Sequence, residues 1–279
     1  MIPRLKLKLR AWAAQSLSRL LGPHSLAILT QTEQGLFAVD PQDFDVGRSL
    51  RQKGNWGQAE LKRLAALLKP ESSVLVVGAH IGSLAIPLAR RCQSLVAIEA
   101  NPKSFELLEL NLRINQIENC QLFCLAASER SETLSFLVNP SNTGGSKRLP
   151  QHKKEIYFYD QPAEIEVQAV ALDTLLTGQH FELIVMDIEG SEYFALKGMQ
   201  ALLAQARVLQ IEFLPHHLQD VSGVSIEAFL GLIYPHFTQL EIPSQNRRVA
   251  QSEFLETLKQ MAAQGLGDDG LIFFKQSPP

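Results

Sequence analysis

The chain has 279 residues, 46% of them apolar, and its 26 Lys and Arg residues against 29 Asp and Glu residues give a formal net charge of −3. This size and composition predict one main domain with small additions at its edges, and the acidic balance argues against nucleic acid as a partner, because contacts to phosphates need a basic face. Three cysteines are too few and too odd in number for a disulfide framework, and the absence of an apolar run of ~18 residues predicts a cytoplasmic protein without a membrane span.

The first 21 residues predict a basic amphipathic helix. Its apolar residues follow helical spacing, its Lys and Arg residues lie outside that face, and no Asp or Glu precedes Glu33. Such a helix can lie on an anionic membrane, which would make the protein peripheral on the inner membrane face. The alternative that we favour is a first helix packed on its own domain, and a transit peptide is a third interpretation. The apolar face consists of Ile2, Leu5, Leu9, Trp12, Ala13 and Leu20.

The next segments predict small elements that lead into the main domain. Residues 27–39 form two apolar runs around Glu33-Gln34-Gly35, which indicates a hairpin, and residues 58–68 have helical spacing up to the stop at Pro70. We therefore expect residues 1–55 to be an N-terminal extension made of the amphipathic helix and the hairpin. Residues 56–279 then form the main domain.

Residues 74–77 form an apolar, largely β-branched run, typical of a strand buried on both faces of a parallel sheet. Gly78 and Gly82 bracket a tight turn into a helix-compatible run, residues 83–89. A second strand, residues 95–98, delivers Glu99 at its carboxyl end, where an acidic side chain accepts hydrogen bonds from the two hydroxyls of a ribose. The pattern predicts a nucleoside cofactor.

The glycine turn indicates which nucleoside is bound. A dinucleotide site needs G-x-G-x-x-G and a P-loop needs Gly-Lys-Ser/Thr, and this chain has neither at the turn. Its looser G-x-x-x-G form suits S-adenosylmethionine, whose amino-acid tail needs room and no phosphate cradle. A plain strand-to-helix turn without a ligand is the structural alternative. A nicotinamide oxidoreductase is the competing enzyme class, and the missing third glycine disfavours it.

Further along the chain the strand and helix alternation continues with one interruption. A helix opens at Pro102, and residues 121–125 form the next strand. Residues 133–138 and 163–172 then predict strands that flank a polar insertion, residues 139–162. As a loop beside the active site this insertion would select an anionic substrate, while as a solvated loop it needs no function. Its basic residues are Lys147, Arg148, Lys153 and Lys154.

Carboxylates fall at three predicted strand ends, and this arrangement predicts the catalytic edge. Asp187 follows the strand at residues 183–186, Glu212 follows the strand at residues 208–211, and Glu99 is the third. The carboxyl ends of parallel strands lie on one edge, above which ligands bind. The candidate catalytic residues are Asp187, Glu189, Glu212 and His216, with His217 as the neighbouring alternative for a neutral imidazole base. Two carboxylates without a matched histidine predict no metal site.

The end of the chain predicts helices at residues 226–233 and 252–263 and strands at residues 237–242 and 271–274. Two late strands without the earlier kind of crossover indicate an antiparallel pair at one edge of the sheet. This topology is typical of methyltransferases rather than dehydrogenases.

Taken together, these pieces resemble the FkbM-type methyltransferase family from about Gly54 to Glu212, with weaker agreement to the C-terminus. Each piece is common by itself, whereas their order and spacing are specific. The resemblance is carried by residues 77–82 (VGAHIG), residues 99–102 (EANP), Leu108, Asn111 and Asn115, residues 126–128 (AAS), residues 142–144 (NTG), residues 170–175 (VALDTL), and residues 186–192 (MDIEGSE) running on to Leu196-Lys197-Gly198.

The resemblance implies an α/β fold of the class I methyltransferase kind, with a Rossmann-like, seven-stranded, mostly parallel sheet, an antiparallel edge pair and helices on both faces. It implies S-adenosylmethionine as the cofactor and O-methylation of a hydroxyl on a sugar, glycolipid or secondary metabolite. We therefore expect a small-molecule or saccharide acceptor and no nucleic acid. The expected cofactor-binding residues are Gly78, Ala79, His80, Gly82, Glu99, Ala100, Asn101, Ala126, Ala127 and Asp187.

Three residues depart from the family pattern. The family usually has Asp where this chain has Val76, Asn where it has His80, and Lys where it has Val185. An unusual substrate or a decayed enzyme would each produce these departures. A non-catalytic cofactor-binding or scaffold protein is therefore the alternative function.

Overall fold

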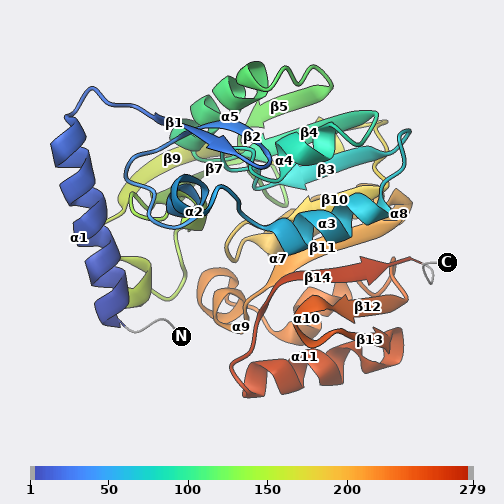
Figure 1. Ribbon diagram of the computed structural model, residues 1–279. Helices are drawn as coiled ribbons and strands as arrows, with labels where there is room; N and C mark the ends of the chain where they lie inside the picture. Colours follow the sequence, from blue (N-terminus) through green and yellow to red (C-terminus); the bar gives the residue numbers. More distant parts are fainter. Residues whose placement is uncertain (1–3, 276–279) are drawn as a thin grey trace.

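The computed structural model describes residues 4–275, and its centre is a twisted eight-stranded sheet (Figure 1). The strand order is β13-β12-β14-β11-β10-β3-β4-β5, in which the five strands from β11 to β5 are parallel and β14, β12 and β13 pair antiparallel. This is the expected class I methyltransferase arrangement with one more strand than the seven expected, because a tight turn after β12 adds β13 at the edge. The strands are β3 (Ser73–Val77), β4 (Ser94–Glu99), β5 (Cys120–Cys124), β10 (Leu183–Met186), β11 (Val208–Phe213), β12 (Gln239–Ile242), β13 (Arg247–Ala250) and β14 (Asp268–Phe274).

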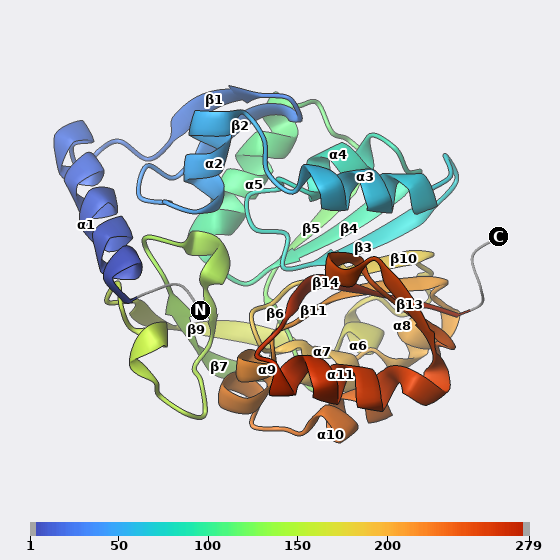
Figure 2. The same cartoon turned by 60° about the horizontal axis from the view of Figure 1, so that its bottom comes forward.

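Helices cover both faces of this sheet (Figure 2). Alternate residues of β3 explain why the strand is apolar throughout, since Val74 and Val76 join the core on one face and Leu75 and Val77 join the core on the other. The first face carries α3 (Gln58–Leu67), α4 (Ala85–Ala89) and α5 (Pro102–Ile114). The second carries α6 (Leu172–Leu175), α7 (Glu192–Lys197), α8 (Gln200–Gln205), α10 (Ile226–Gly231) and α11 (Phe254–Ala263).

The predicted hairpin consists of β1 (Ile28–Thr32) and β2 (Gly35–Val39), followed by α2 (Val46–Lys53). Asn111 of α5 and Asn115, which directly follows that helix, bind the backbone of the hairpin: Asn111 Oδ1 accepts from the Ala38 amide at 2.6 Å, and Asn115 Nδ2 donates to the Leu36 carbonyl at 2.7 Å. Phe37 of β2 is fully buried in the same core as β3 and β4. The hairpin is thus packed into the main core, and the division of the chain at residue 55 stays a prediction.

The segment predicted as a polar insertion belongs to a second, four-stranded sheet. Its order is β6-β9-β7-β8, and β7 and β9 pair antiparallel along their whole length. The residues between β7 and β9 form 3-10 turns and a short strand, and several of their polar side chains are buried. Residues 139–150 are therefore a packed wall rather than a solvated loop, whereas residues 151–155 are exposed to solvent. The strands are β6 (Ala126–Ala127), β7 (Glu132–Val138), β8 (Lys147–Arg148) and β9 (Ala163–Val170).

Helix α1 (Arg4–Leu21) lies at the margin of the molecule (Figure 1) and packs through a different face from the one expected. Its buried residues are Leu7, Ala11 and Ala14. The predicted apolar face points outward, with Leu9, Trp12 and Leu20 exposed by 55%, 67% and 83%. Ile2 and the side chain of Leu5, also expected on this face, lie outside what the structure describes. Within the described residues, no helix combines the length and apolar character that crossing a membrane requires.

Candidate active site

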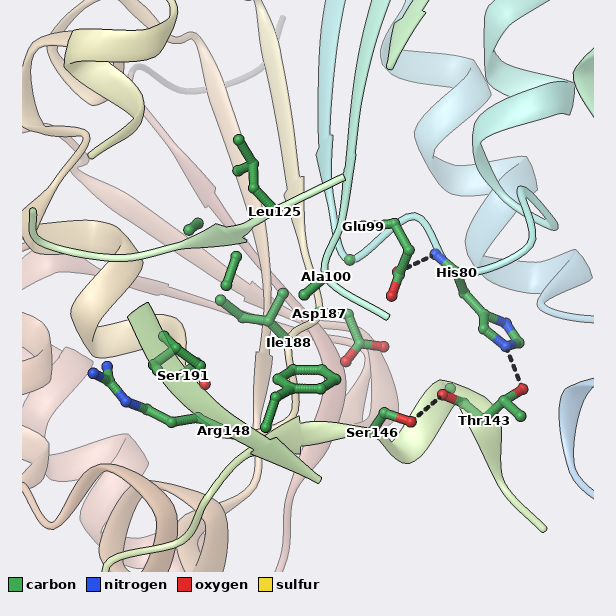
Figure 3. A pocket seen from close by; sticks show the side chains of 16 residues that line it. His80, Glu99, Ala100, Leu125, Thr143, Ser146, Arg148, Asp187, Ile188 and Ser191 are labelled. Carbon is green, nitrogen blue, oxygen red and sulfur yellow. Dashed lines mark hydrogen bonds between the residues drawn. The ribbon is translucent and has the colours of Figure 1, made fainter. Parts of the chain in front are cut away.

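A cavity of about 580 Å³, partly open to solvent, lies beyond the carboxyl ends of β3, β4 and β10 (Figure 3). The second sheet and the Thr143–Gly145 turn close it from the opposite side. The lining residues are Gly78, His80, Glu99, Ala100, Leu125, Ala126, Ala127, Leu134, Phe136, Thr143, Gly144, Ser146, Arg148, Asp187, Ile188 and Ser191.

Glu99 is held rigidly at the edge of this cavity. One carboxylate oxygen accepts from the His80 amide at 2.7 Å and the other accepts from the Asn101 amide at 2.8 Å. Burial raises the pKa of this carboxyl, while the charge of His80 and the backbone amide donors act in the opposite direction. Each oxygen retains acceptor capacity beyond these bonds, because an ionised carboxylate offers about four lone-pair sites. The arrangement fits a pair of ribose hydroxyls.

The turn after β3 is shaped by close backbone contact. Gly78 has φ of 89°, and a Cβ there would lie 1.8 Å from the carbonyl oxygen of Asp187. Only glycine therefore lets the exits of β3 and β10 approach each other. His80 is also left-handed, with φ of 52°, a conformation that His tolerates better than most residues, as does the Asn usual in the family.

The His80 side chain ties this turn to the rest of the wall. Its Nε2 lies 2.7 Å from the hydroxyl of Thr143 (Figure 3), and that hydroxyl donates to the Asp43 carboxylate at 2.9 Å. Three segments that are distant in the sequence are therefore joined at one corner of the cavity.

A second cavity adjoins the first. Gly78, His80, Gly144 and Asp187 line both, so these residues form the wall between them. The second cavity has a volume of about 820 Å³, which includes its opening to solvent. Its described lining contains four carboxylates and neither Lys nor Arg. The carboxylates are Asp45, Glu60, Asp187 and Glu189, and the other lining residues are Val46, Trp56, Gly57, Val76, Val77, Ala79, Ser83, Leu84, Asn142 and Val185.

Two of the three departures from the family pattern lie side by side in this second cavity. Val76 of β3 and Val185 of β10 are direct partners in the parallel register, and each is 2% exposed. An apolar pair thus occupies neighbouring positions at which the family has an acid and a base. A lone charge at such a buried position would be costly, whereas the matched pair of valines leaves none.

Asp187 faces both cavities, and its side chain is exposed to solvent through them, while protein surrounds it on its other sides and desolvates the carboxyl there. Burial, followed by the charges of Glu189 and Glu192, raises the pKa of Asp187 well above its usual range. Burial also raises the pKa of Glu192 to about 7, although its carboxylate accepts from the Ile188 amide. A carboxyl group with a raised pKa is a stronger proton acceptor when ionised, which is the property expected of a general base.

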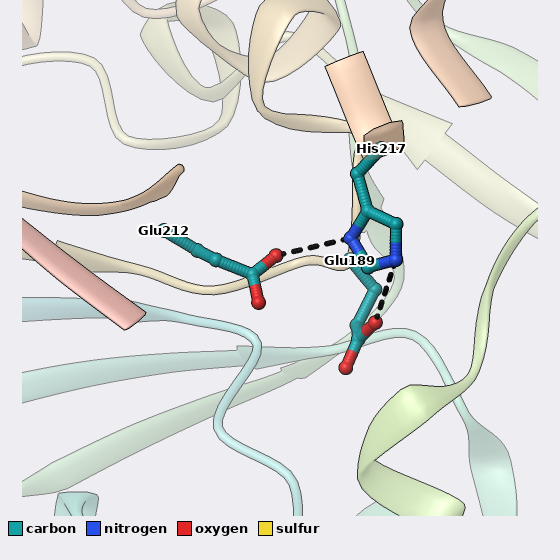
Figure 4. A group of neighbouring side chains, drawn as sticks. All are labelled: Glu189, Glu212 and His217. Atoms are coloured by element: carbon teal, nitrogen blue, oxygen red, sulfur yellow. Dashed lines mark hydrogen bonds and ion pairs between the residues drawn. The ribbon is translucent and has the colours of Figure 1, made fainter. Parts of the chain in front are cut away.

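Behind Glu189 lies a buried chain of charged and polar groups (Figure 4). Lys147 Nζ is 2.7 Å from Glu189 Oε2 and 3.3 Å from His217 Nε2, and His217 Nδ1 is 3.3 Å from Glu212 Oε2. Because a lysine ammonium only donates, His217 Nε2 accepts from it, which leaves Nδ1 to donate to Glu212. Burial, together with the charge of Lys147, holds the pKa of His217 well below its usual range and keeps the ring neutral.

The expected catalytic residues are therefore only partly brought together. Asp187 lines both cavities and Glu189 lines the second. Glu212 lies within β11 rather than beyond its end, and its carboxylate contacts His217, the last residue of the short helix α9 (Pro215–His217). His216 belongs to neither cavity lining, and its ring stacks on Tyr157.

Most of the expected cofactor residues lie around the first cavity, with three exceptions. Ala79 lines the second cavity, whereas Gly82 and Asn101 line neither. Asn101 instead caps α5 by accepting from the Lys103 amide. Lys147 was noted in the sequence only as one of several basic residues of an insertion. Its spacing from Glu189 gives no signal, because the contact depends on how the second sheet docks.

Among the residues that the structure describes, two sets of three side chains have ligand atoms within 4.8 Å of one another, which is close enough to share a metal ion. In the set Glu189, Glu212 and His217, the Lys147 ammonium already contacts two members. The other set is Asp187, Glu192 and Glu212, three carboxyls whose pKa values are raised by desolvation and by the charges of neighbouring carboxylates. The absence of a metal stays a prediction.

Comparisons with known proteins identify related sequences and folds. A 51-residue stretch, 18% of this chain and 11% of the relative, is 43% identical to an uncharacterised RNA methyltransferase of Gloeobacter violaceus. The chain thus spans about a tenth of that relative's length. Among solved structures, TYW2 of M. jannaschii in complex with AdoMet is 13% identical, with 89% of this chain and 85% of that one covered and a TM-score of 0.47. The M. jannaschii tRNA m1G37 methyltransferase is 12% identical, with 92% and 59% covered and a TM-score of 0.45.

These names correct one expectation. The net charge led us to expect no nucleic acid partner, and this expectation is wrong as a general exclusion, because the relative that shares a 51-residue stretch is named an RNA methyltransferase. Net charge is a poor guide here, because it averages over the whole chain and an acidic protein can still carry a basic segment.

The family itself is shown by a longer match. Residues 77–262, more than half of the chain, match the model of the methyltransferase FkbM domain. The matched region contains the glycine turn, Glu99, Asp187 and the sheet that positions them. This confirms the resemblance seen in the motifs and the cofactor expected from the glycine turn. The chain belongs to the FkbM methyltransferase family, and S-adenosylmethionine is its cofactor.

Proposed function

We propose that the protein transfers the methyl group of S-adenosylmethionine to a hydroxyl oxygen of a sugar, a glycolipid or a secondary metabolite. The observation that carries this proposal is the position of Asp187, which borders both the first cavity, where Glu99 lies, and the second cavity with its four carboxylates. Methyl transfer requires the acceptor oxygen to be aligned with the methyl group and its proton to be removed. A carboxylate at the shared wall supplies the second requirement.

The first cavity fits the nucleoside part of the cofactor. Glu99 would accept hydrogen bonds from the ribose hydroxyls, and the small residues Ala100, Ala126 and Ala127 leave room for a flat base beside Phe136. When bound, the cofactor supplies an electrophilic methyl group on a sulfonium. The residues of the chain then have only to hold the two reactants and receive one proton.

We assign the proton to Asp187 and a positioning role to the groups behind it. Glu189 lines the second cavity, where its carboxylate would orient the acceptor hydroxyl. Its backbone has a φ of 57°, a left-handed conformation of the kind that is often found at functional sites. Lys147 fixes the Glu189 carboxylate, and His217 and Glu212 fix Lys147. We assign no role to His216.

The exposed face of α1 favours a lipid-linked acceptor among these classes. Arg10 of α1 lies 3.7 Å from the Asp45 carboxylate, and Asp45 lines the second cavity, so the helix stands beside the acceptor site. Its outward Trp12 and Leu9 have the character of residues that insert at a membrane interface, with Lys8 and Arg19 beside them. Five Lys and Arg residues and no acidic residue precede Glu33, which complements an anionic lipid surface.

We expect the protein to bind vesicles that contain an anionic phospholipid, and this binding to weaken with salt. Replacing Leu9 and Trp12 together by Gln should reduce binding at least tenfold, because each side chain contributes about 1.5–3 kcal/mol when it leaves water. Leu266→Gln is the control, since Leu266 is a 45% exposed leucine outside α1. Sedimentation with vesicles measures both. Equal binding by the double variant, or salt-sensitive binding of RNA and not of vesicles, would contradict the lipid assignment.

A methyl-transfer screen with labelled S-adenosylmethionine tests the reaction itself. Three pools of acceptors should be offered to the full-length protein: a glycolipid extract, soluble sugars and metabolites, and total RNA. We expect label on oxygen in the first or second pool, lost in the Asp187→Asn variant. The RNA methyltransferase name of the Gloeobacter relative makes the third pool the competing outcome, and label in RNA alone would overturn the acceptor class proposed here. Binding of the cofactor without label in any pool would favour the non-catalytic alternative.

A further inference from the structure

The four carboxylates of the second cavity differ in their partners. Asp45 lies 3.7 Å from Arg10, and Glu189 lies 2.7 Å from Lys147, so each has a cation at hand. Asp187 and Glu60 have no ion pair with a Lys or Arg among residues 7–275, whose side chains the structure describes. Asp187 has been assigned the acceptor's proton, which leaves Glu60 as a carboxylate directed at the cavity without an assigned role.

Glu60 reaches the floor of the cavity from α3. Its Oε1 accepts a hydrogen bond from Gln210 of β11, which is 3% exposed. Gln210 is the register partner of Val185, and Val185 is the partner of Val76, so these three residues form one row across the sheet. The Glu60 carboxylate therefore lies at one end of an apolar floor that begins at Val76, the position at which the family has its acid.

Burial raises the pKa of Glu60, and the hydrogen bond from Gln210 and the charge of Arg63, which forms no ion pair with it, offset only part of this effect. A half-buried carboxylate whose main partner is a neutral amide gains most from a ligand that brings a cation. The remaining polar atom of that amide, Gln210 Oε1, is buried and has no hydrogen-bond partner among the described residues. Gln210 lines neither cavity, so the Glu60 carboxylate is the acceptor that a ligand can reach, and it suits a donor with several hydrogens, such as an ammonium group.

The cofactor brings such a group. Its amino-acid tail ends in an ammonium and a carboxylate, and a cofactor held at its ribose by Glu99 in the first cavity has its tail free to enter the second across the wall at Gly78 and His80. We infer that Glu60 binds the ammonium group of the cofactor's methionine tail, which then shares the second cavity with the acceptor. The inference concerns cofactor binding alone and is independent of which acceptor is methylated.

Two ligands separate this contact from the rest of the site. S-adenosylhomocysteine carries the ammonium as its only cationic group, whereas 5′-methylthioadenosine has the same nucleoside and sulfur but no amino-acid tail. Calorimetry with the wild-type chain should show tighter binding of the first. In Glu60→Gln we expect the affinity for S-adenosylhomocysteine to fall roughly ten- to a hundredfold, with that for methylthioadenosine within about twofold of the wild type.

Asp45→Asn is the matched control, because Asp45 lines the same cavity but already pairs with Arg10. It should leave both affinities within about threefold of the wild type. Glu60→Asp keeps the charge on a shorter side chain and serves if the glutamine variant does not fold; it should weaken binding of S-adenosylhomocysteine only. Equal losses for both ligands, an equal effect of Asp45→Asn, or an unchanged affinity in the Glu60 variants would each overturn the assignment, whatever the outcome of the methyl-transfer screen.

Discussion

Replacing Asp187 by Asn should lower kcat by about 10²- to 10⁴-fold, the range expected when a general base is removed. Asn has nearly the same size and stays able to accept a hydrogen bond from the acceptor hydroxyl, but it cannot take the proton. Binding of S-adenosylhomocysteine should change little, since Glu99 and the glycine turn remain.

Glu189→Gln should depress turnover at least tenfold with the same unchanged cofactor affinity, because it leaves Lys147 without its anionic partner.

The pH profile distinguishes a base from a merely structural residue. Asp187 acts as a base only when ionised, so activity should fall as the pH falls through its pKa. Because burial and the neighbouring carboxylates raise that pKa, the fall should begin at a higher pH than for an ordinary aspartate. The Asn variant should lose this limb and keep a flat residual rate. A variant with near-wild-type turnover, or with the same acid limb, would show that the proton goes elsewhere.

Glu99→Ala should weaken binding of both S-adenosylhomocysteine and methylthioadenosine, because it removes the group that holds the ribose common to the two. Hydrogen bonds to a charged group contribute about 1.5–3 kcal/mol, so the dissociation constants should rise roughly ten- to a hundredfold. This pattern differs from that of Glu60→Gln, which should spare methylthioadenosine.

The same substitution affects the fold as well as the ligand. The amides of His80 and Asn101 lose their acceptor, and each donor left buried without one costs about 1–3 kcal/mol. Thermal unfolding without ligand should therefore accompany the binding measurement. A folded variant that binds the cofactor as tightly as the wild type would remove the assignment of Glu99 to the ribose.

Much of the sheet was predictable, since the strands that form it are short apolar runs with clear boundaries. Val74 to Val77 reads as a strand buried on both faces because its alternate side chains do enter two cores. The same logic placed Glu99 and Asp187 at one edge of the sheet. Their approach to a common cavity follows from parallel topology, without knowledge of any side-chain contact.

Contacts between distant segments could not be predicted from the sequence, because the relative positions of these segments depend on tertiary packing. Lys147 reaches Glu189 and His217 because β8 docks beside β7, and nothing in the local pattern encodes that approach. Helix α1 shows the same limit. Its spacing identifies an apolar face, but the small side chains of Ala11 and Ala14 let the opposite side pack on the domain. Periodicity shows that a helix has faces, and docking decides which one is covered.

The register partnership of Val76 and Val185 limits how this chain can have diverged. An ancestor with the family's acid and base at these positions could not lose either one alone without stranding the opposite charge in the interior, which costs several kcal/mol. We therefore expect the two positions to change together, because a chain with a charge at only one of them is less stable than a chain with both charges or with two valines. Relatives that carry valine at one position should carry an uncharged residue at the other, so a change in this pair marks a branch of the family rather than scattered loss.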